Sequence, residues 1–186
     1  MKLIYYSFLI VFLTIFLLIP FILVFLFLFI TSRGPVLYWS TRIGRNNNSF
    51  RMPKFRTMPL DTPDIASHLL HEKKINLILG GNFLRKTSLD EIPQFWSIIR
   101  GDMSLVGPRP ALYNQKDLIK LRTKKGVHKI KPGITGWAQV NGRDELSISD
   151  KVSLDLEYVN YQSFWFDIKI LWMTFSKVLS CDGVIH

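Results

Sequence analysis

The sequence predicts an α+β protein that is mostly helical, with a membrane helix first and one folded domain after it that includes a small β-hairpin. Residues 3–30 contain no charged side chain, whereas every acidic residue and all basic residues except Lys2 lie after this run. The later part alternates segments of helical or strand spacing with glycine- and proline-rich loops. We therefore expect a membrane anchor in residues 1–32 and a domain in residues 33–186.

The apolar N-terminal run exceeds the roughly 20 residues that a membrane helix needs. A cleaved secretory signal is not favoured, because its apolar core has about 7–15 residues and ends at a small-residue site. Pro20 lies inside the run, where it removes a backbone hydrogen bond and disfavours a helical conformation at Ile19. Two interpretations stay open: a kinked spanning helix, and a helix broken at Pro20 that enters and leaves the membrane by one face.

The charge pattern predicts the side of the membrane on which the domain lies. The chain holds 24 Lys and Arg against 14 Asp and Glu, a formal net charge of +10. Basic residues follow the apolar run closely, as is typical of cytoplasmic loops. Cys181 is the only cysteine, which excludes an intrachain disulfide and fits a reducing compartment. We expect the domain on the cytoplasmic face.

Spacing and turn residues predict the elements of the domain. The expected elements are strands at 35–41 and 49–57 around a turn at 45–48, helices at 63–79, 92–100 and 112–125, a rigid loop at 107–110, an ordered loop at 129–143, and a helical last third with a break near 160–163. The aromatic segment 164–173 is either a core-packing helix or a helix lying in the membrane interface.

Asp90 and Glu91 are adjacent acids in a basic stretch, within residues 88–94 (Ser-Leu-Asp-Glu-Ile-Pro-Gln). One interpretation is helix capping, either by a Ser88–Glu91 capping box or by Asp90 as the N-cap. Pro93 weakens the capping box, because it would fall where the helix needs an N–H. The alternative is catalytic: one carboxylate attacks phosphorus and the other holds a divalent metal.

Clusters of cations occur near this pair in the sequence. Lys54 and Arg56 would share one face of a strand, Arg85 lies just upstream of the acids, and Arg109 lies on the rigid loop. Arginine suits bidentate phosphate binding, and lysine acts as a point charge. Each cluster alone is typical of a solvated surface, but together they suit a diphosphate-containing substrate.

Residues 131–143 form a second candidate site. Its glycines would let the backbone approach a ligand, and Gln139, Asn141 and Arg143 would hydrogen-bond a base, sugar or phosphate. The alternative is a packed surface loop anchored by Trp137. Sequence patterns for a Rossmann site, a P-loop, a zinc cluster or a nucleophile elbow are absent from the chain.

Four ordered motifs carry a family resemblance. They are residues 54–58 (Lys-Phe-Arg-Thr-Met), 88–94, 101–110 (Gly-Asp-Met-Ser-Leu-Val-Gly-Pro-Arg-Pro) and 132–143 (Pro-Gly-Ile-Thr-Gly through Gln-Val-Asn-Gly-Arg). With them the chain resembles the bacterial sugar transferases, specifically the small monotopic phosphoglycosyl transferases of the PglC-like form. The resemblance covers nearly the whole chain.

The resemblance implies an enzyme of the bacterial inner membrane that moves a sugar-1-phosphate from a UDP-sugar to undecaprenyl phosphate. It implies Asp90 as the nucleophile of a covalent phosphosugar intermediate and Glu91 as the partner of Mg²⁺, with Arg85 and Arg109 at phosphate-contacting positions. It also implies a re-entrant helix broken at Pro20, where Ile19 replaces the family's serine. Downstream glycosyltransferases are possible partners and nucleic acid is not. The sugar, the glycan and the oligomeric state stay open.

The residues alone leave two alternatives to this function open. One is a non-enzymatic, membrane-tethered basic module that binds anionic lipid or nucleic acid, which the positive net charge permits. The acid pair within the basic segment argues against it. The other is an enzyme with the same substrates that transfers in one direct step, with Asp90 and Glu91 binding only metal.

Overall fold

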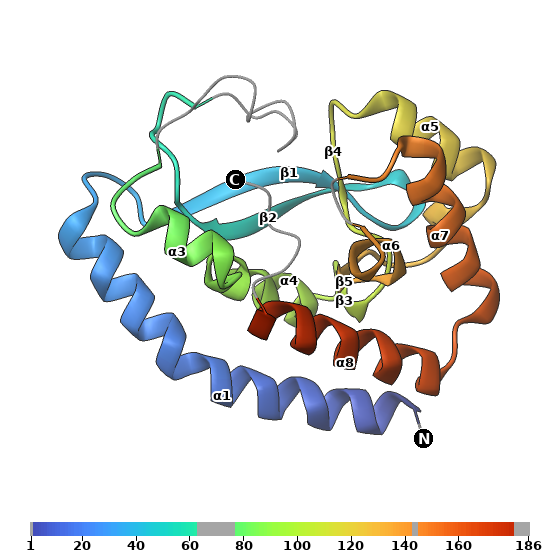
Figure 1. Ribbon diagram of the computed structural model, residues 1–186, viewed down its shortest axis with the longest axis horizontal. Helices are drawn as coiled ribbons and strands as arrows, with labels where there is room; N and C mark the ends of the chain where they lie inside the picture. Colours follow the sequence, from blue (N-terminus) through green and yellow to red (C-terminus); the bar gives the residue numbers. More distant parts are fainter. Residues whose placement is uncertain (1, 63–76, 143–144, 181–186) are drawn as a thin grey trace.

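The N-terminal helix is long and bent. The computed structural model describes residues 2–62, 77–142 and 145–180, with side chains from residue 15 to residue 178 within those ranges. Helix α1 (Lys2–Thr31) continues through Pro20, and Figure 1 shows its two halves running in different directions. Proline explains the bend, because its ring clashes with the preceding turn and it donates no N–H. Within the described part of the chain, no helix combines the length and hydrophobicity that a membrane crossing requires.

The C-terminal half of α1 packs against the domain. Val24 and Leu28 are buried there against Phe55, Leu84 and Ile92. These contacts join the apolar helix to the strand and the helical turn that carry the candidate site residues, so α1 and the site are one structural unit.

The predicted β-hairpin is confirmed. Strands β1 (Leu37–Ile43) and β2 (Ser49–Phe55) pair antiparallel, and β4 (Ala111–Leu112) adds to the other edge of β1. The connecting turn, η1 (Arg45–Asn47), places Asn46 and Asn47 at φ of 55° and 62°. Asparagine tolerates this left-handed conformation, which explains the run of asparagines in the turn.

The segment predicted as an ordered loop contains regular structure, so that prediction was wrong in part. Strand β5 (Gly133–Thr135) pairs parallel with β3 (Ser104–Val106), between η3 (Val127–Lys129) and α6 (Trp137–Val140). A Cβ on Gly133 would lie 2.1 Å from the backbone nitrogen of Gly107, and one on Gly136 would lie 2.1 Å from its carbonyl oxygen. The glycines therefore serve the close approach of two backbone segments.

Most of the remaining helices follow the sequence prediction with shifted ends, but the first of them, at residues 81–86, was not predicted. They are α3 (Gly81–Lys86), η2 (Leu89–Gln94), α4 (Phe95–Ile99), α5 (Lys116–Lys124), α7 (Ile148–Tyr161) and α8 (Phe164–Ser180). The helix expected from residue 92 begins as a 3₁₀ turn at Leu89, and the one expected from residue 112 begins at Lys116, because Leu112 pairs in β4. The expected break separates α7 from α8. Most of the helix expected at 63–79 lies outside the described residues.

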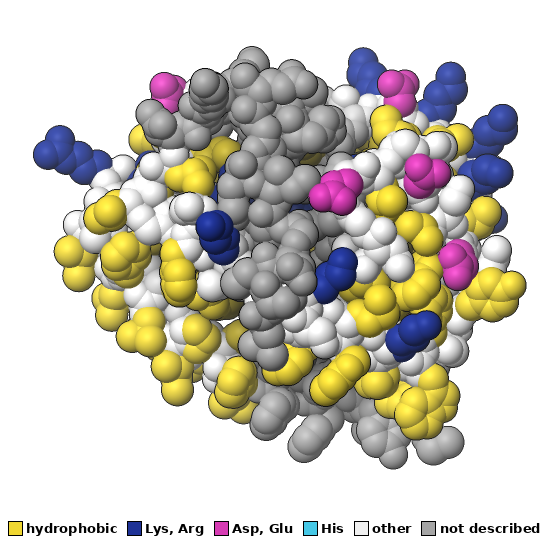
Figure 2. All heavy atoms as spheres, viewed as in Figure 1, with side chains coloured by type: hydrophobic (Ala, Val, Ile, Leu, Met, Phe, Trp, Pro, Cys, Tyr) yellow, Lys and Arg dark blue, Asp and Glu magenta, His cyan; other side chains and the backbone are white. Residues whose placement is uncertain are grey.

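Helix α8 has two apolar faces. One packs into the main core, where Ile170 is fully buried beside Tyr158 of α7. The other exposes Trp165 (79%), Trp172 (68%) and Phe175 (56%). In Figure 1, α8 runs along the same side of the molecule as the N-terminal half of α1, and Figure 2 shows hydrophobic side chains gathered over that lower part of the view.

Candidate active site

Glu91 lies between two cations that come from distant parts of the chain. Its Oε1 accepts from Nζ of Lys54 at 2.7 Å and from Nη2 of Arg109 at 3.1 Å. Lys54 comes from β2 and Arg109 from the loop between β3 and β4, while Glu91 lies in η2. The Glu91 side chain is only 11% exposed. Charge-assisted hydrogen bonds of this kind are strong when partly shielded from water, so the structure brings together three of the residues that the sequence singled out.

Asp90 is buried beside this cluster and does not cap the helix. It lies inside η2 and is 8% exposed, while the N-cap position belongs to Ser88. Ser88 adopts a left-handed conformation (φ 56°) and its side chain makes no capping hydrogen bond. Both capping interpretations were therefore wrong. The left-handed residue lets α3 turn sharply into a 3₁₀ helix, which places Asp90 and Glu91 in its first turn.

The loop that carries Arg109 is fixed along its whole length. Gly107 N–H donates to the Thr135 carbonyl at 2.9 Å, and the Pro108 carbonyl accepts from Gly133 N–H at 3.0 Å. The Arg109 carbonyl accepts from Arg122 at 2.7 Å, and the Pro110 carbonyl accepts from Arg42 at 3.3 Å. Each of the four loop residues thus has a backbone group bonded to another segment. The predicted rigid loop is confirmed, and its rigidity does not come from proline alone.

The charge state of Lys54 depends on Glu91. Burial lowers the pKa of Lys54, the Glu91 carboxylate opposes that shift, and the Arg109 guanidinium adds to it. Desolvation disfavours the charged amine, whereas a nearby opposite charge favours it. Glu91 therefore helps to keep a partly buried ammonium charged in the site.

Arg56 does not join the Glu91 cluster, although the sequence predicted that it would share a face with Lys54. Strand β2 ends at Phe55, and the Arg56 guanidinium turns to the end of α1. It donates to the carbonyls of Pro35 and Arg33 at 2.8 and 2.7 Å and to the Ser32 hydroxyl. Its interactions hold the segment that follows α1 against the end of the sheet.

The other predicted site residues lie in different settings. Arg85 is in the last turn of α3, where its guanidinium approaches the Met58 sulfur at 3.9 Å. Gln139 donates to the Ile134 carbonyl at 2.8 Å, and its buried Oε1 has no hydrogen-bond partner in the structure. Arg143 lies outside the described residues. The Gln139 amide thus joins α6 to β5.

The acid pair suits one divalent cation more than a complete protein metal cage. Within residues 2–62, 77–142 and 145–180 no cluster of three or more metal-binding side chains is found. Mg²⁺ commonly takes one or two carboxylates and completes its shell with water and substrate phosphates. Adjacent carboxylates therefore fit the ion. Lys54 and Arg109 would compete with it for Oε1 of Glu91.

Sequence reasoning missed two residues behind the Arg109 loop. Arg122 of α5 donates to Asp155 of α7 through Nε (2.9 Å) and Nη2 (2.6 Å), in addition to its bond to the Arg109 carbonyl. A signal was present, because Asp155 lies three residues from both Val152 and Tyr158, on the buried side of an amphipathic helix. An acid in that position is rarely buried without a partner.

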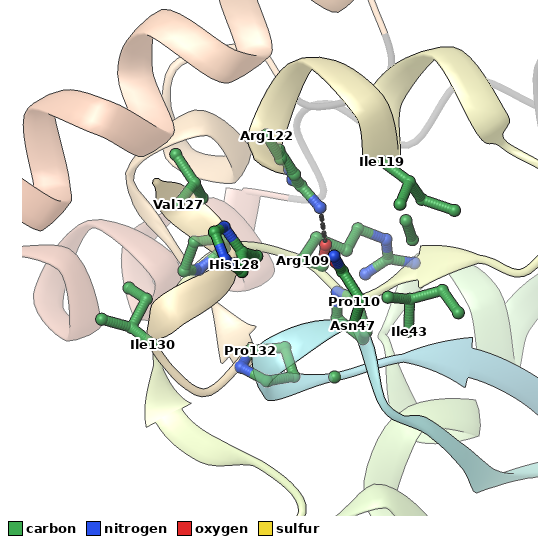
Figure 3. A pocket seen from close by; sticks show the side chains of 13 residues that line it. Ile43, Asn47, Arg109, Pro110, Ile119, Arg122, Val127, His128, Ile130 and Pro132 are labelled. Atoms are coloured by element: carbon green, nitrogen blue, oxygen red, sulfur yellow. Dashed lines mark hydrogen bonds between the residues drawn. The ribbon is translucent and has the colours of Figure 1, made fainter. Parts of the chain in front are cut away.

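A shallow pocket opens on the far side of the same loop. It has an empty volume of about 360 Å³ and is lined by the loop, the end of β1, α5 and η3. Figure 3 shows Arg122 reaching across it to the Arg109 backbone. The loop is therefore contacted on one side by Glu91 and on the other by Arg122.

Fold and site define a class: a small α+β domain joined to an apolar helix, with two adjacent acids, of which Asp90 is buried and Glu91 is paired with two cations. The chain belongs to the bacterial sugar transferase family, whose sequence profile matches residues 1–181. This confirms the resemblance that the four motifs predicted. Membership of a transferase family also favours the enzymatic interpretation over the non-enzymatic basic module.

Curated relatives support the same family. An uncharacterized sugar transferase, EpsL of Bacillus subtilis, is 44% identical over 81% of this chain and 73% of its own length. The galactosyl transferase CpsE of Streptococcus agalactiae is 40% identical over 81% of the chain and 36% of its own length. The UDP-glucose:undecaprenyl-phosphate glucose-1-phosphate transferase of Escherichia coli is 41% identical over 80% of the chain and 33% of its own length. The chain thus spans about a third of these two longer relatives.

Proposed function

We propose that the protein is a phosphoglycosyl transferase that moves a sugar-1-phosphate from a UDP-sugar to undecaprenyl phosphate. The products would be UMP and an undecaprenyl-diphosphate-sugar, the first membrane-bound intermediate of a bacterial glycoconjugate. The observation that carries the proposal is the Lys54–Glu91–Arg109 cluster beside buried Asp90. The relative from Escherichia coli, named for such a transfer from UDP-glucose, supports the choice of substrates.

The proposed reaction has two steps. A carboxylate oxygen of Asp90 attacks the phosphorus that bears the sugar, the bond from that phosphorus to the bridging oxygen breaks, and UMP leaves with that oxygen. A phosphate oxygen of undecaprenyl phosphate then attacks the same phosphorus and displaces Asp90 as a free carboxylate. Covalent catalysis of this kind divides one difficult transfer into two easier ones.

The neighbouring residues would balance the negative charge of the substrate. Arg109 presents a planar guanidinium suited to two phosphate oxygens, and Lys54 supplies a compact charge from the sheet. Arg85 is a further phosphate contact in this proposal. Glu91 would hold Mg²⁺, which, when bound, offsets charge on the phosphate oxygens. Because these groups are already positioned, they need little reorganisation when the transition state forms.

The membrane association of the protein is part of the same proposal. The bent helix α1 would lie in the cytoplasmic leaflet as a re-entrant anchor, with both ends on the cytoplasmic side. The exposed aromatic face of α8 would lie in the interface on the same side of the molecule. This arrangement would hold the site near the head group of the lipid acceptor.

The test is release of UMP by purified protein given Mg²⁺ and a panel of UDP-sugars. The proposal expects UMP release together with a mass increment of one phosphosugar on the peptide that contains Asp90. Asp90→Asn should abolish both. Exchange of labelled UMP into the UDP-sugar without lipid acceptor separates the covalent route from direct transfer, since only the covalent route supports it. Salt-sensitive binding of DNA or anionic lipid without UMP release would instead favour the non-enzymatic module.

A further inference from the structure

The Arg122–Asp155 ion pair, which touches the Arg109 loop, is well shielded from solvent. The Arg122 and Asp155 side chains are 12% and 2% exposed. Burial raises the pKa of Asp155, and Arg122 opposes that shift by its charge and hydrogen bonds. A buried pair of this kind is weak evidence for stability, because desolvation cancels much of the attraction between the charges. The role of the pair is therefore better explained by the backbone segment that it holds in place.

Arg122 uses its fork-shaped guanidinium to join two segments. Nε and Nη2 reach one carboxylate oxygen of Asp155, while Nη1 donates to the Arg109 carbonyl (Figure 3). The side chain of the same Arg109 reaches Glu91 at 3.1 Å. Arg109 thus has its carbonyl fixed by Arg122 and its guanidinium fixed on Glu91.

Helix α7 supports the start of the loop as well. Tyr158 lies three residues after Asp155, on the same face of α7, and its hydroxyl lies 3.3 Å from the Val106 carbonyl and 2.8 Å from Asp167. Residues 106–110 are therefore braced from α7 at two points, one through Arg122 and one through Tyr158.

We infer that Arg122 and Asp155 are positioning residues, which fix the Arg109 backbone so that its guanidinium meets Glu91 and the substrate phosphate. The inference rests on the proposed function for its kinetic readout. Small displacements of a group that stabilises the transition state reduce rates strongly even when the fold is intact. The pair therefore contributes more to catalysis than to stability.

The test uses the full-length double variant Arg122→Met/Asp155→Leu. It replaces the ion pair with apolar side chains of similar size, a change that keeps or raises stability in many proteins. We expect an unchanged or higher Tm, together with a fall in kcat for UMP release of about tenfold or more. Arg45→Met is the matched control, because exposed Arg45 also donates to a backbone carbonyl, that of Lys129, at 2.9 Å. It should retain the wild-type kcat.

Coupling to Arg109 distinguishes positioning from a general effect. If the pair acts through Arg109, adding the double variant to Arg109→Met should cost no further activity, whereas independent effects would multiply. Multiplying losses, or a double variant as active as Arg45→Met, would overturn the inference. Conversely, a double variant with a markedly lower Tm and a kcat per folded molecule equal to wild type would assign the pair to stability alone.

A second readout does not need activity. Hydrogen exchange of the Gly107 and Arg109 amides should accelerate in the double variant and stay unchanged in Arg45→Met. If the wild-type protein released no UMP from any UDP-sugar, the proposed function would fail, and this exchange measurement would still decide whether the pair holds the loop. Equal exchange rates in all three proteins would refute the positioning role by itself.

Discussion

Lys54 and Glu91 form an ion pair with 2.7 Å between Nζ and Oε1, although 37 residues separate them in the sequence. The pair joins the hairpin to the 3₁₀ helix that carries both candidate catalytic acids. Burial lowers the pKa of Lys54 and Glu91 raises it. Glu91 therefore helps to set the charge that Lys54 presents to a substrate.

Glu91→Gln should slow UMP release by about 100-fold, a typical cost of losing one group that stabilises transition-state charge. The amide no longer balances Lys54 and Arg109, and it is a poor ligand for Mg²⁺. Initial rates at saturating UDP-sugar measure the effect. Asp117→Asn makes the same type of substitution at an exposed site on α5 and should keep the wild-type rate. A Glu91→Gln protein with the wild-type rate and the same Mg²⁺ requirement would contradict both roles of Glu91.

Lys54→Met should change how stability depends on pH at alkaline values. The folded pKa of Lys54 lies below the unfolded value of 10.5, so between the two pKa values the unfolded chain binds one more proton. The free energy of unfolding of the wild type therefore gains a contribution as pH rises through this window. Other groups titrate there too, so the measurement is the difference between wild-type and variant unfolding curves from neutral pH to pH of about 10. A constant difference across that range would rule out the shift.

Much of the fold follows from local sequence signals. The hairpin and the break between α7 and α8 depend on neighbouring residues, such as the asparagines that accept positive φ at η1. The prolines of the Arg109 loop also predicted its rigidity, although bonds to distant segments complete it. The β3–β5 pairing could not be predicted from local signals. It joins residues 104–106 to residues 133–135 and depends on the fit of Gly107 against Gly133. Non-local pairing of short strands leaves no periodic signal in the sequence.

The candidate site was predicted only in part, because some of its contacts also join segments that are distant in the sequence. Lys54, Glu91 and Arg109 were singled out by residue type and motif, and the structure brings them together. Arg56 was placed with them by strand periodicity, but β2 ends one residue earlier, so alternation no longer determines its direction. The position of Asp155 on the apolar side of its helix signals a buried acid that needs a partner. The link from Arg122 to the backbone carbonyl of Arg109 has no such signal, because every residue has the same backbone carbonyl whatever its side chain.

Arg56→Met should destabilise the protein without changing its chemistry. The guanidinium is buried and donates to two backbone carbonyls at the end of α1. Losing charged hydrogen bonds of this type should lower the free energy of unfolding by about 2–3 kcal/mol. Chemical denaturation in a mild detergent measures this, and UMP release per folded molecule should equal the wild type. If the variant had wild-type stability and a large loss of activity, Arg56 would be assigned to substrate binding instead.

Trp172→Glu should affect the lipid step more than the nucleotide step. Trp172 lies on the exposed face of α8 and makes its ring contact with Phe175 on that same face. A carboxylate there would oppose insertion into the interface and move the site away from the lipid head group. Exchange of labelled UMP should persist, while transfer to undecaprenyl phosphate in vesicles falls. Tyr113→Glu places the same charge at a similarly exposed aromatic outside α8 and should leave both steps intact. Equal loss in both half-reactions would argue against an interfacial role.

Pro20→Ala should change the topology of the anchor. A proline bend lets a long apolar helix turn back to the face it entered, and alanine, the best helix former, would favour a straight helix. Its length would then suffice to carry the N-terminus across the bilayer.

In a Cys181→Ser background, Lys2→Cys and Arg33→Cys should both react with an impermeant maleimide from the cytoplasmic face. Adding Pro20→Ala should move the reactivity of Lys2→Cys to the opposite face, while Arg33→Cys, the internal control, stays cytoplasmic. Labelling of Lys2→Cys from the opposite face before Pro20 is replaced would establish a kinked spanning helix in place of a re-entrant one.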